Sequence, residues 1–135
     1  MEVQHMQIGE VAHRTGLSLR TIRYYEEMGL VIPSARSAGG FRLYTDADIA
    51  RLQLIKRMKP LEFSLEETKD LLDTLDTLGT ADDAEERKTL VGRLETYHQA
   101  AEARVVSVRE QLAIAEGFAA EIRREIADHR SGTNR

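Results

Sequence analysis

The chain has 135 residues, a formal net charge of −4 and no cysteine. This length fits one domain, or one small domain with an extended appendage, and the missing thiols exclude disulfides, catalytic cysteines and thiolate sites for soft metals. No segment approaches the ~20 apolar residues of a membrane span and no apolar N-terminal run resembles a signal peptide, so a cytoplasmic protein is expected.

The charge is unevenly distributed along the chain. Residues 1–60 hold nine Arg and Lys against six Asp and Glu, whereas residues 61–135 hold ten against seventeen. The local field around a surface decides whether it attracts an anion, and the total charge matters less. The basic first half therefore keeps nucleic acid open as a partner.

The first half begins with two short amphipathic segments separated by a glycine. Residues 8–16 (IGEVAHRTG) predict a short helix that ends at Gly16. Ser18 is the expected N-cap of a second helix over residues 18–30. A helix, a tight glycine turn and a second helix predict a helix-turn-helix.

The second helix is expected to have an apolar face opposite an Arg/Tyr face, the arrangement that a helix in the major groove requires. Tyr25 belongs to the apolar face and to the core, while Tyr24 lies opposite and is a candidate DNA contact. Arg20, in the first turn, is the expected base-reading residue, since Arg paired with guanine is the commonest specific contact. The full apolar face comprises Leu19, Ile22, Tyr25 and Gly29.

Residues 39–44 predict a small β wing. Ala38-Gly39-Gly40 indicates a turn, and residues 41–44 (FRLY) alternate as a strand does. This alternation puts Arg42 and Tyr44 on one face, which we expect to lie in solvent along a phosphate backbone. Arg36, in the preceding loop, is a further candidate contact.

A third helix is expected over residues 46–59, opened by a Thr45/Asp48 capping box and stopped by Pro60. Lys59, with Lys56 and Arg57, could contact phosphates. Basic residues in a last helical turn also complement the helix dipole, and the sequence leaves both interpretations open.

Three runs, IGEVAHRTGLSLRTIRYYEEMGLV, FRLYTDADIARLQLIKRMK and FSLEETKDLL, resemble the MerR family of bacterial transcription regulators over residues 8–73. The resemblance implies a bacterial, nucleoid-associated protein whose long helices pair antiparallel in a homodimer. It also implies binding between promoter elements that are too far apart, with a distortion of the DNA that lets RNA polymerase engage both. Glu62 stands where members commonly carry glycine, and Pro60 is also unusual there.

The second half predicts a short helix and then a long one. Ser64 with Glu67 opens the short helix, Gly79 is its expected C-cap, and Asp82 or Asp83 caps the next helix.

The long helix carries an apolar seam with steps of three and four residues and a single stutter between Ala101 and Val105. Such a helix cannot bury its stripe alone, and its simplest partner is a second copy. The seam passes Gly117 in phase, so no full break is expected there. The predicted dimer interface comprises Leu90, Leu94, Tyr97, Ala101, Val105, Val108, Leu112, Ala115, Ala119 and Ile122.

The sequence gives little support for a metal site or an enzyme active site. Glu95, His98 and Glu102 share a helix edge at a spacing that could hold a metal, but such a charged edge is usually solvated surface. No catalytic motif indicates an enzyme. A pure coiled-coil protein would not need the winged motif, and an excisionase-like or architectural DNA binder would lack the long helix.

The sequence therefore predicts a mostly α protein: a winged helix-turn-helix domain with a two-stranded wing over residues 1–79, a coiled-coil dimerisation helix over 80–128 and a disordered tail over 129–135. Neither a metal nor a cofactor is expected. The alternative is a small architectural or excisionase-like DNA-binding protein without an effector. The predicted DNA contacts are Ser18, Arg20, Thr21, Arg23, Tyr24, Arg36, Arg42, Tyr44 and Lys59.

Overall fold

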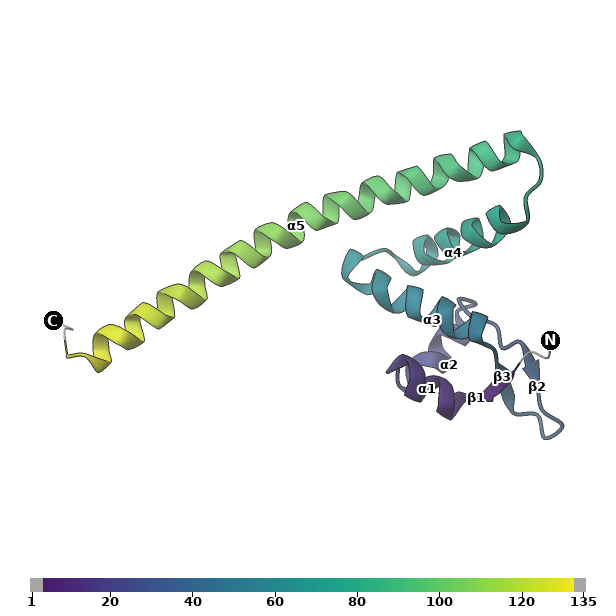
Figure 1. The fold of residues 1–135 in the computed structure, drawn as a ribbon, viewed down its shortest axis with the longest axis horizontal. Coiled ribbons are helices and arrows are strands. Elements are labelled where there is room, and N and C mark those ends of the chain that lie inside the picture. Colours follow the sequence, from purple (N-terminus) through teal and green to yellow (C-terminus); the bar gives the residue numbers. More distant parts are fainter. Residues whose placement is uncertain (1–3, 133–135) are drawn as a thin grey trace. The chain divides into compact units, whose positions relative to one another are not determined.

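The computed structural model describes residues 4–132 of the chain. They divide into two compact units with the boundary between Leu94 and Glu95, and each unit is described by itself. The first unit contains short helices and a small sheet, and the second is a single helical segment (Figure 1).

The first unit opens with β1 (Met6–Gln7), α1 (Ile8–Thr15) and α2 (Leu19–Glu27). Helix α1 ends as predicted at Gly16, whose φ of 73° is a left-handed conformation that favours glycine. Ser18 caps α2, because its hydroxyl accepts a hydrogen bond from the backbone N–H of Thr21 at 3.0 Å. The predicted helix, glycine turn and second helix are thus confirmed, although α2 ends at Glu27 and not at the predicted residue 30.

The sheet has three strands rather than the predicted two. Strands β2 (Ala35–Arg36) and β3 (Arg42–Tyr44) form the wing hairpin, and β1 pairs antiparallel with the other edge of β3. Met6 lies opposite Tyr44 in this pairing. The sequence analysis missed β1 because a strand of two residues has no alternation to detect.

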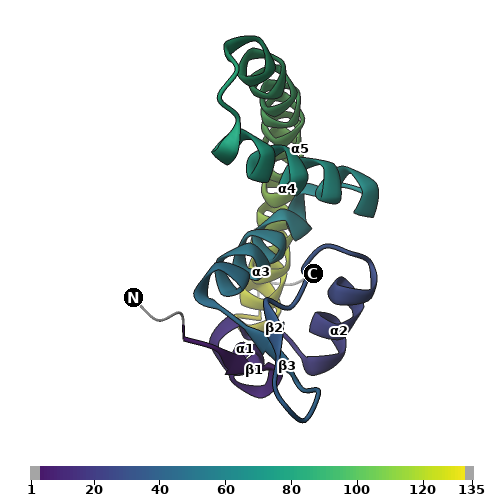
Figure 2. The same cartoon turned by 90° about the vertical axis from the view of Figure 1, so that its right-hand side faces the viewer.

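Helices α3 (Asp46–Met58) and α4 (Leu65–Thr80) complete the frame, joined by a 3-10 turn, η1 (Lys59–Leu61). Both predicted capping boxes are present, at Thr45/Asp48 and at Ser64/Glu67. Figures 1 and 2 show α3 between α4 and the α1–α2 pair. The core between them comprises Met6, Val11, Ile22, Leu30, Val31, Tyr44, Leu52, Ile55 and Leu72.

Helix α5 (Ala84–Arg130) continues through Gly117 without a break, as expected, and Asp83 accepts a hydrogen bond from the Glu86 N–H at its start. Two boundary predictions in the second half of the chain were wrong. Gly79 is not a C-cap, because α4 continues past it to Thr80. The helix also includes residues 129 and 130, which were assigned to the tail; residues 133–135 lie outside the described residues. None of the helices within residues 4–132 is both long and apolar enough to cross a membrane.

Glu62 occupies the turn between η1 and α4 with a φ of 59°, a conformation that costs L-residues other than glycine about 1–2 kcal/mol. We therefore expect Glu62→Gly to raise the free energy of unfolding by about 1 kcal/mol, despite the greater chain entropy of glycine in the unfolded state. Urea titration followed by circular dichroism measures this gain. Glu62→Ala is the matched control, and an equal gain there would show that the left-handed backbone is not the cause.

Candidate nucleic-acid interface

Helix α2 presents the predicted Arg/Tyr face to solvent. Ile22 is fully buried and Tyr25 packs against the core, whereas Tyr24 on the other side is 46% exposed. Arg20 and Arg23 are exposed and form no ion pair with any side chain in residues 4–132. Their charge is available to a ligand. Leu19, assigned to the apolar face, is 41% exposed and anchors the helix only in part.

Ser18 and Thr21 lie at the N-terminus of the same helix. The Ser18 hydroxyl donates to Oγ1 of Thr21 at 2.9 Å and accepts from its backbone N–H, so both side chains take part in the cap. A helix N-terminus favours anions such as phosphate because its N–H groups point outward and its dipole is positive. These two predicted contacts therefore stand where a phosphate could approach.

The wing places two cations side by side. Arg36 on β2 is directly opposite Arg42 on β3, and the strands are joined by a turn in which the Gly40 N–H donates to the Ser37 carbonyl at 2.9 Å. The Arg36 guanidinium also donates to the Gly40 carbonyl at 3.1 Å, which ties it to the turn. The two arginines form a paired basic edge beside α2.

Tyr44 does not face solvent, and its assignment as a DNA contact was wrong. Arg42 and Tyr44 do share a face, as the strand alternation predicted, but that face packs against Glu26 of α2. Tyr44 is fully buried, because β3 is the central strand of the sheet and is covered on the α2 side. Burial, and then the hydrogen bond to Glu26, raise the pKa of Tyr44.

Glu26 is the residue of the site that the sequence analysis missed. Its carboxylate lies within 2.8 Å of the Arg42 Nε, accepts the Tyr44 hydroxyl at 3.0 Å and lies 3.9 Å from Arg36. The hydrogen bond to this carboxylate is the main reason that the pKa of Arg42 is raised. No sequence pattern reveals the cluster, because Glu26 is 16 positions from Arg42.

Phe41 is a second residue that the prediction left out. It follows the glycine turn, precedes β3 and is 63% exposed. Lys59 is exposed in η1, as a phosphate contact requires. Lys56 instead donates to the backbone carbonyl of Thr15 at 2.9 Å, so it ties α3 to the C-terminal end of α1.

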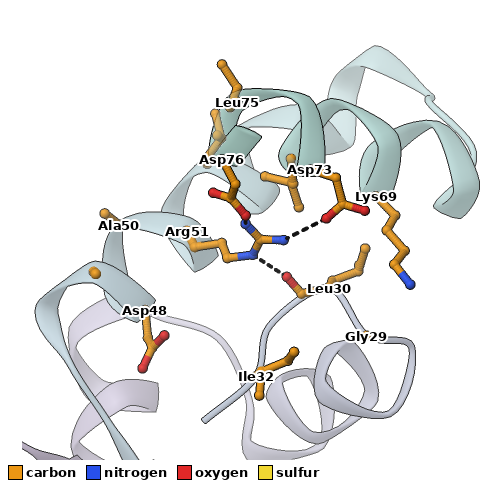
Figure 3. Close-up of a pocket in the computed structure, with 13 residues that line it drawn as sticks. Gly29, Leu30, Ile32, Asp48, Ala50, Arg51, Lys69, Asp73, Leu75 and Asp76 are labelled. Carbon is orange, nitrogen blue, oxygen red and sulfur yellow. Dashed lines mark hydrogen bonds and ion pairs between the residues drawn. The ribbon is translucent and has the colours of Figure 1, made fainter. Parts of the chain in front are cut away.

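Arg51 of α3 contacts both the segment that follows α2 and two carboxylates of α4 (Figure 3). Its Nε donates to the backbone carbonyl of Leu30, just after α2, and its Nη1 pairs with Asp76 of α4 at 2.7 Å. Asp73 lies 3.7 Å from Nη2. These residues line a pocket of about 650 Å³. Their contacts join α3 and α4 to the loop that follows α2.

Of the possible metal edge on α5, one contact between a histidine and a carboxylate is formed. His98 Nε2 lies 3.0 Å from the Glu102 carboxylate, and both side chains are exposed. Within the described residues, no group of three or more His, Cys, Asp or Glu side chains is placed to hold a metal ion.

A helix-turn-helix whose second helix exposes arginines and a tyrosine, next to a strand wing with two more arginines, defines a winged helix-turn-helix DNA-binding protein. Residues 6–75 match the family model described as MerR HTH family regulatory protein. The chain belongs to this family.

Curated relatives are similar in sequence to the same half of the chain. It is 45% identical over 67 residues to the transcriptional regulator HmrR of Sinorhizobium medicae, a match covering 50% of this chain and 46% of HmrR. Identity is also 45% over 67 residues to the transcriptional activator mta of Bacillus subtilis, covering 26% of that protein. The matched stretch thus spans about half or less of these relatives. All are transcription regulators or activators, which supports a regulator over an enzyme.

Solved structures extend the similarity beyond the first unit. HiNmlR, a MerR family regulator lacking the sensor domain and bound to promoter DNA, is 25% identical with a TM-score of 0.69, over 92% of this chain and 94% of that one. PbrR691 of Ralstonia metallidurans, solved in complex with lead(II), is 31% identical with a TM-score of 0.54, over 88% of this chain and 86% of that one.

Proposed function

We propose that the chain is a homodimeric, sequence-specific transcription regulator that acts in the bacterial cytoplasm, at the nucleoid. The observation that carries the proposal is the exposed face of α2, with Arg20, Arg23 and Tyr24, beside the paired arginines of the wing. Phosphate contacts from the wing would fix the position of the protein along the DNA, and α2 would contact base edges in the major groove. HiNmlR, which is similar over 92% of this chain, was solved on promoter DNA.

Dimerisation is supported by the seam of α5, which is uncovered in its later part, although its first predicted residue, Leu90, is buried within the single chain. Val105, Val108 and Leu112 are 42%, 40% and 56% exposed in the single chain. Two copies paired along this seam, antiparallel as in the family, would present two recognition helices to a pseudo-palindromic operator. We propose that the dimer distorts promoter DNA so that RNA polymerase can engage both promoter elements, at a deformation cost of a few kcal/mol that backbone contacts offset.

Soft-metal sensing does not follow from the relatives. PbrR691 was solved with lead(II), but these 135 residues contain no cysteine, and thiolates are the ligands that select soft metals.

The experiment is selection of duplexes from a random library by the purified chain, followed by affinity measurements on the selected operator and on random duplex. We expect two inverted half-sites, two chains bound per duplex and a clear preference over random DNA. A monomer that binds all duplexes alike would instead support the architectural alternative.

Arg20→Ala should lower affinity by about 1–3 kcal/mol for the operator, and this loss should depend on one base position in each half-site. The reason is that Arg20 lies exposed in the first turn of α2, where an arginine can reach the edge of a guanine. Titration of operators carrying single base-pair changes measures it. Arg36→Ala is the comparison and should weaken all duplexes alike; a uniform loss for Arg20→Ala would make Arg20 a phosphate contact.

A further inference from the structure

The wing is tied to the recognition helix through one carboxylate. Glu26 lies on α2, its side chain is 15% exposed, and its three partners are Arg36 on β2 with Arg42 and Tyr44 on β3. Two of these partners are the cations that form the basic edge of the wing. The same group therefore holds the wing in place and carries the negative charge nearest to its arginines.

The contact uses only part of the Arg42 guanidinium. Its Nε lies 2.8 Å from Oε1 and 2.7 Å from Oε2 of Glu26, while neither Nη group makes a hydrogen bond within residues 4–132. An arginine presents five donors in a rigid fork, so fixing Nε also fixes the direction of the other four. Glu26 thereby orients the Nη groups, which remain free for a phosphate.

We propose that Glu26 is a positioning residue that determines DNA specificity; this rests on the proposed function. Glu26 fixes the position of the wing relative to α2, the recognition helix. Its negative charge also partly neutralises the wing arginines, which weakens their attraction to DNA of arbitrary sequence. Binding to random DNA depends almost wholly on cation–phosphate attraction. A carboxylate beside Arg42 and Arg36 weakens that attraction. Affinity for the operator increases when the wing is held in a fixed position relative to α2, because the base contacts of α2 and the phosphate contacts of the wing can then form together.

Glu26→Gln separates charge from geometry, because the amide keeps the shape and can still accept from Arg42. We expect random duplex to bind about 3- to 10-fold more tightly, with a salt slope steeper by about 0.9 per wing. Operator affinity should change less, so the ratio of operator to random affinity falls. Glu27→Gln is the matched control: it makes the same charge change one position along, on an exposed side chain that forms no hydrogen bond to the wing and whose charge has the weakest of the effects on the pKa of Arg42.

Two further variants make the test decisive. Glu26→Ala removes the anchor as well as the charge and should weaken operator binding at least 10-fold without weakening random duplex. In an Arg42→Gln background, the increase in affinity for random duplex caused by Glu26→Gln should be at least threefold smaller. The reason is that Glu26 then no longer neutralises the Arg42 charge. Circular dichroism of each variant confirms the fold.

Equal effects of Glu26→Gln and Glu27→Gln on random duplex would overturn the proposal, since only net charge would then matter. A gain that persists unchanged in the Arg42→Gln background would overturn it too. Failure of the proposed function is distinguishable, because the unaltered chain would then show no preference between its selected operator and random duplex.

Discussion

Leu112→Glu should convert the dimer into monomers at micromolar concentration. Leu112 lies in the proposed seam of α5 and is 56% exposed in the single chain, and pairing of two chains along this seam would bury it. The substitution would place a carboxylate without a partner in that interface twice, once from each copy, and each buried ion costs several kcal/mol. A loss of about 4 kcal/mol raises the dissociation constant a thousandfold. Sedimentation velocity measures the mass, and operator affinity should fall with it.

Ile114→Glu is the matched control for this experiment. Ile114 is on the same helix and is 74% exposed, but it lies two positions after Leu112 and so points to a different side. It should leave the dimer intact. A dimer that survives Leu112→Glu, or one that Ile114→Glu splits equally well, would mean that the seam has been assigned to the wrong face.

Tyr44→Ala should strongly destabilise the first unit rather than remove a DNA contact. Tyr44 is fully buried in the core, and truncating a large buried side chain costs about 3–5 kcal/mol. For a domain of this size each kcal/mol lowers the melting temperature by about 4–8 °C, so a fall of roughly 12–40 °C is expected. Thermal unfolding followed by circular dichroism measures it.

Two tyrosine variants control for this result. Tyr24→Ala makes the same substitution on a side chain that is 46% exposed, and it should change the melting temperature by only a few degrees. Tyr44→Phe keeps the ring and removes only the 3.0 Å hydrogen bond to Glu26, which should cost about 1 kcal/mol. If Tyr24→Ala were as damaging as Tyr44→Ala, the burial of Tyr44 would not be the cause.

Caps, breakers and periodicity were predictable because each acts over a few residues. Ser18 caps α2, Gly16 ends α1 and Thr45 pairs with Asp48 as the sequence indicated. The same kind of local evidence failed at Gly79, where a glycine near a helix end was taken for the end itself. A glycine inside a helix destabilises it by only about 1 kcal/mol relative to alanine, so the presence of a glycine does not by itself decide where the helix ends.

The sequence by itself determined the helices, most of their apolar faces and the family, since these depend on neighbours along the chain. Only the tertiary structure decided which face of the wing is buried, because strand alternation pairs Arg42 with Tyr44 but does not say what covers them. It also brought Glu26 to the wing, and Arg51 to Leu30 and Asp76, over separations of 16 to 25 residues. Such contacts follow from how helices and strands pack in space, and no local pattern of residue types encodes them.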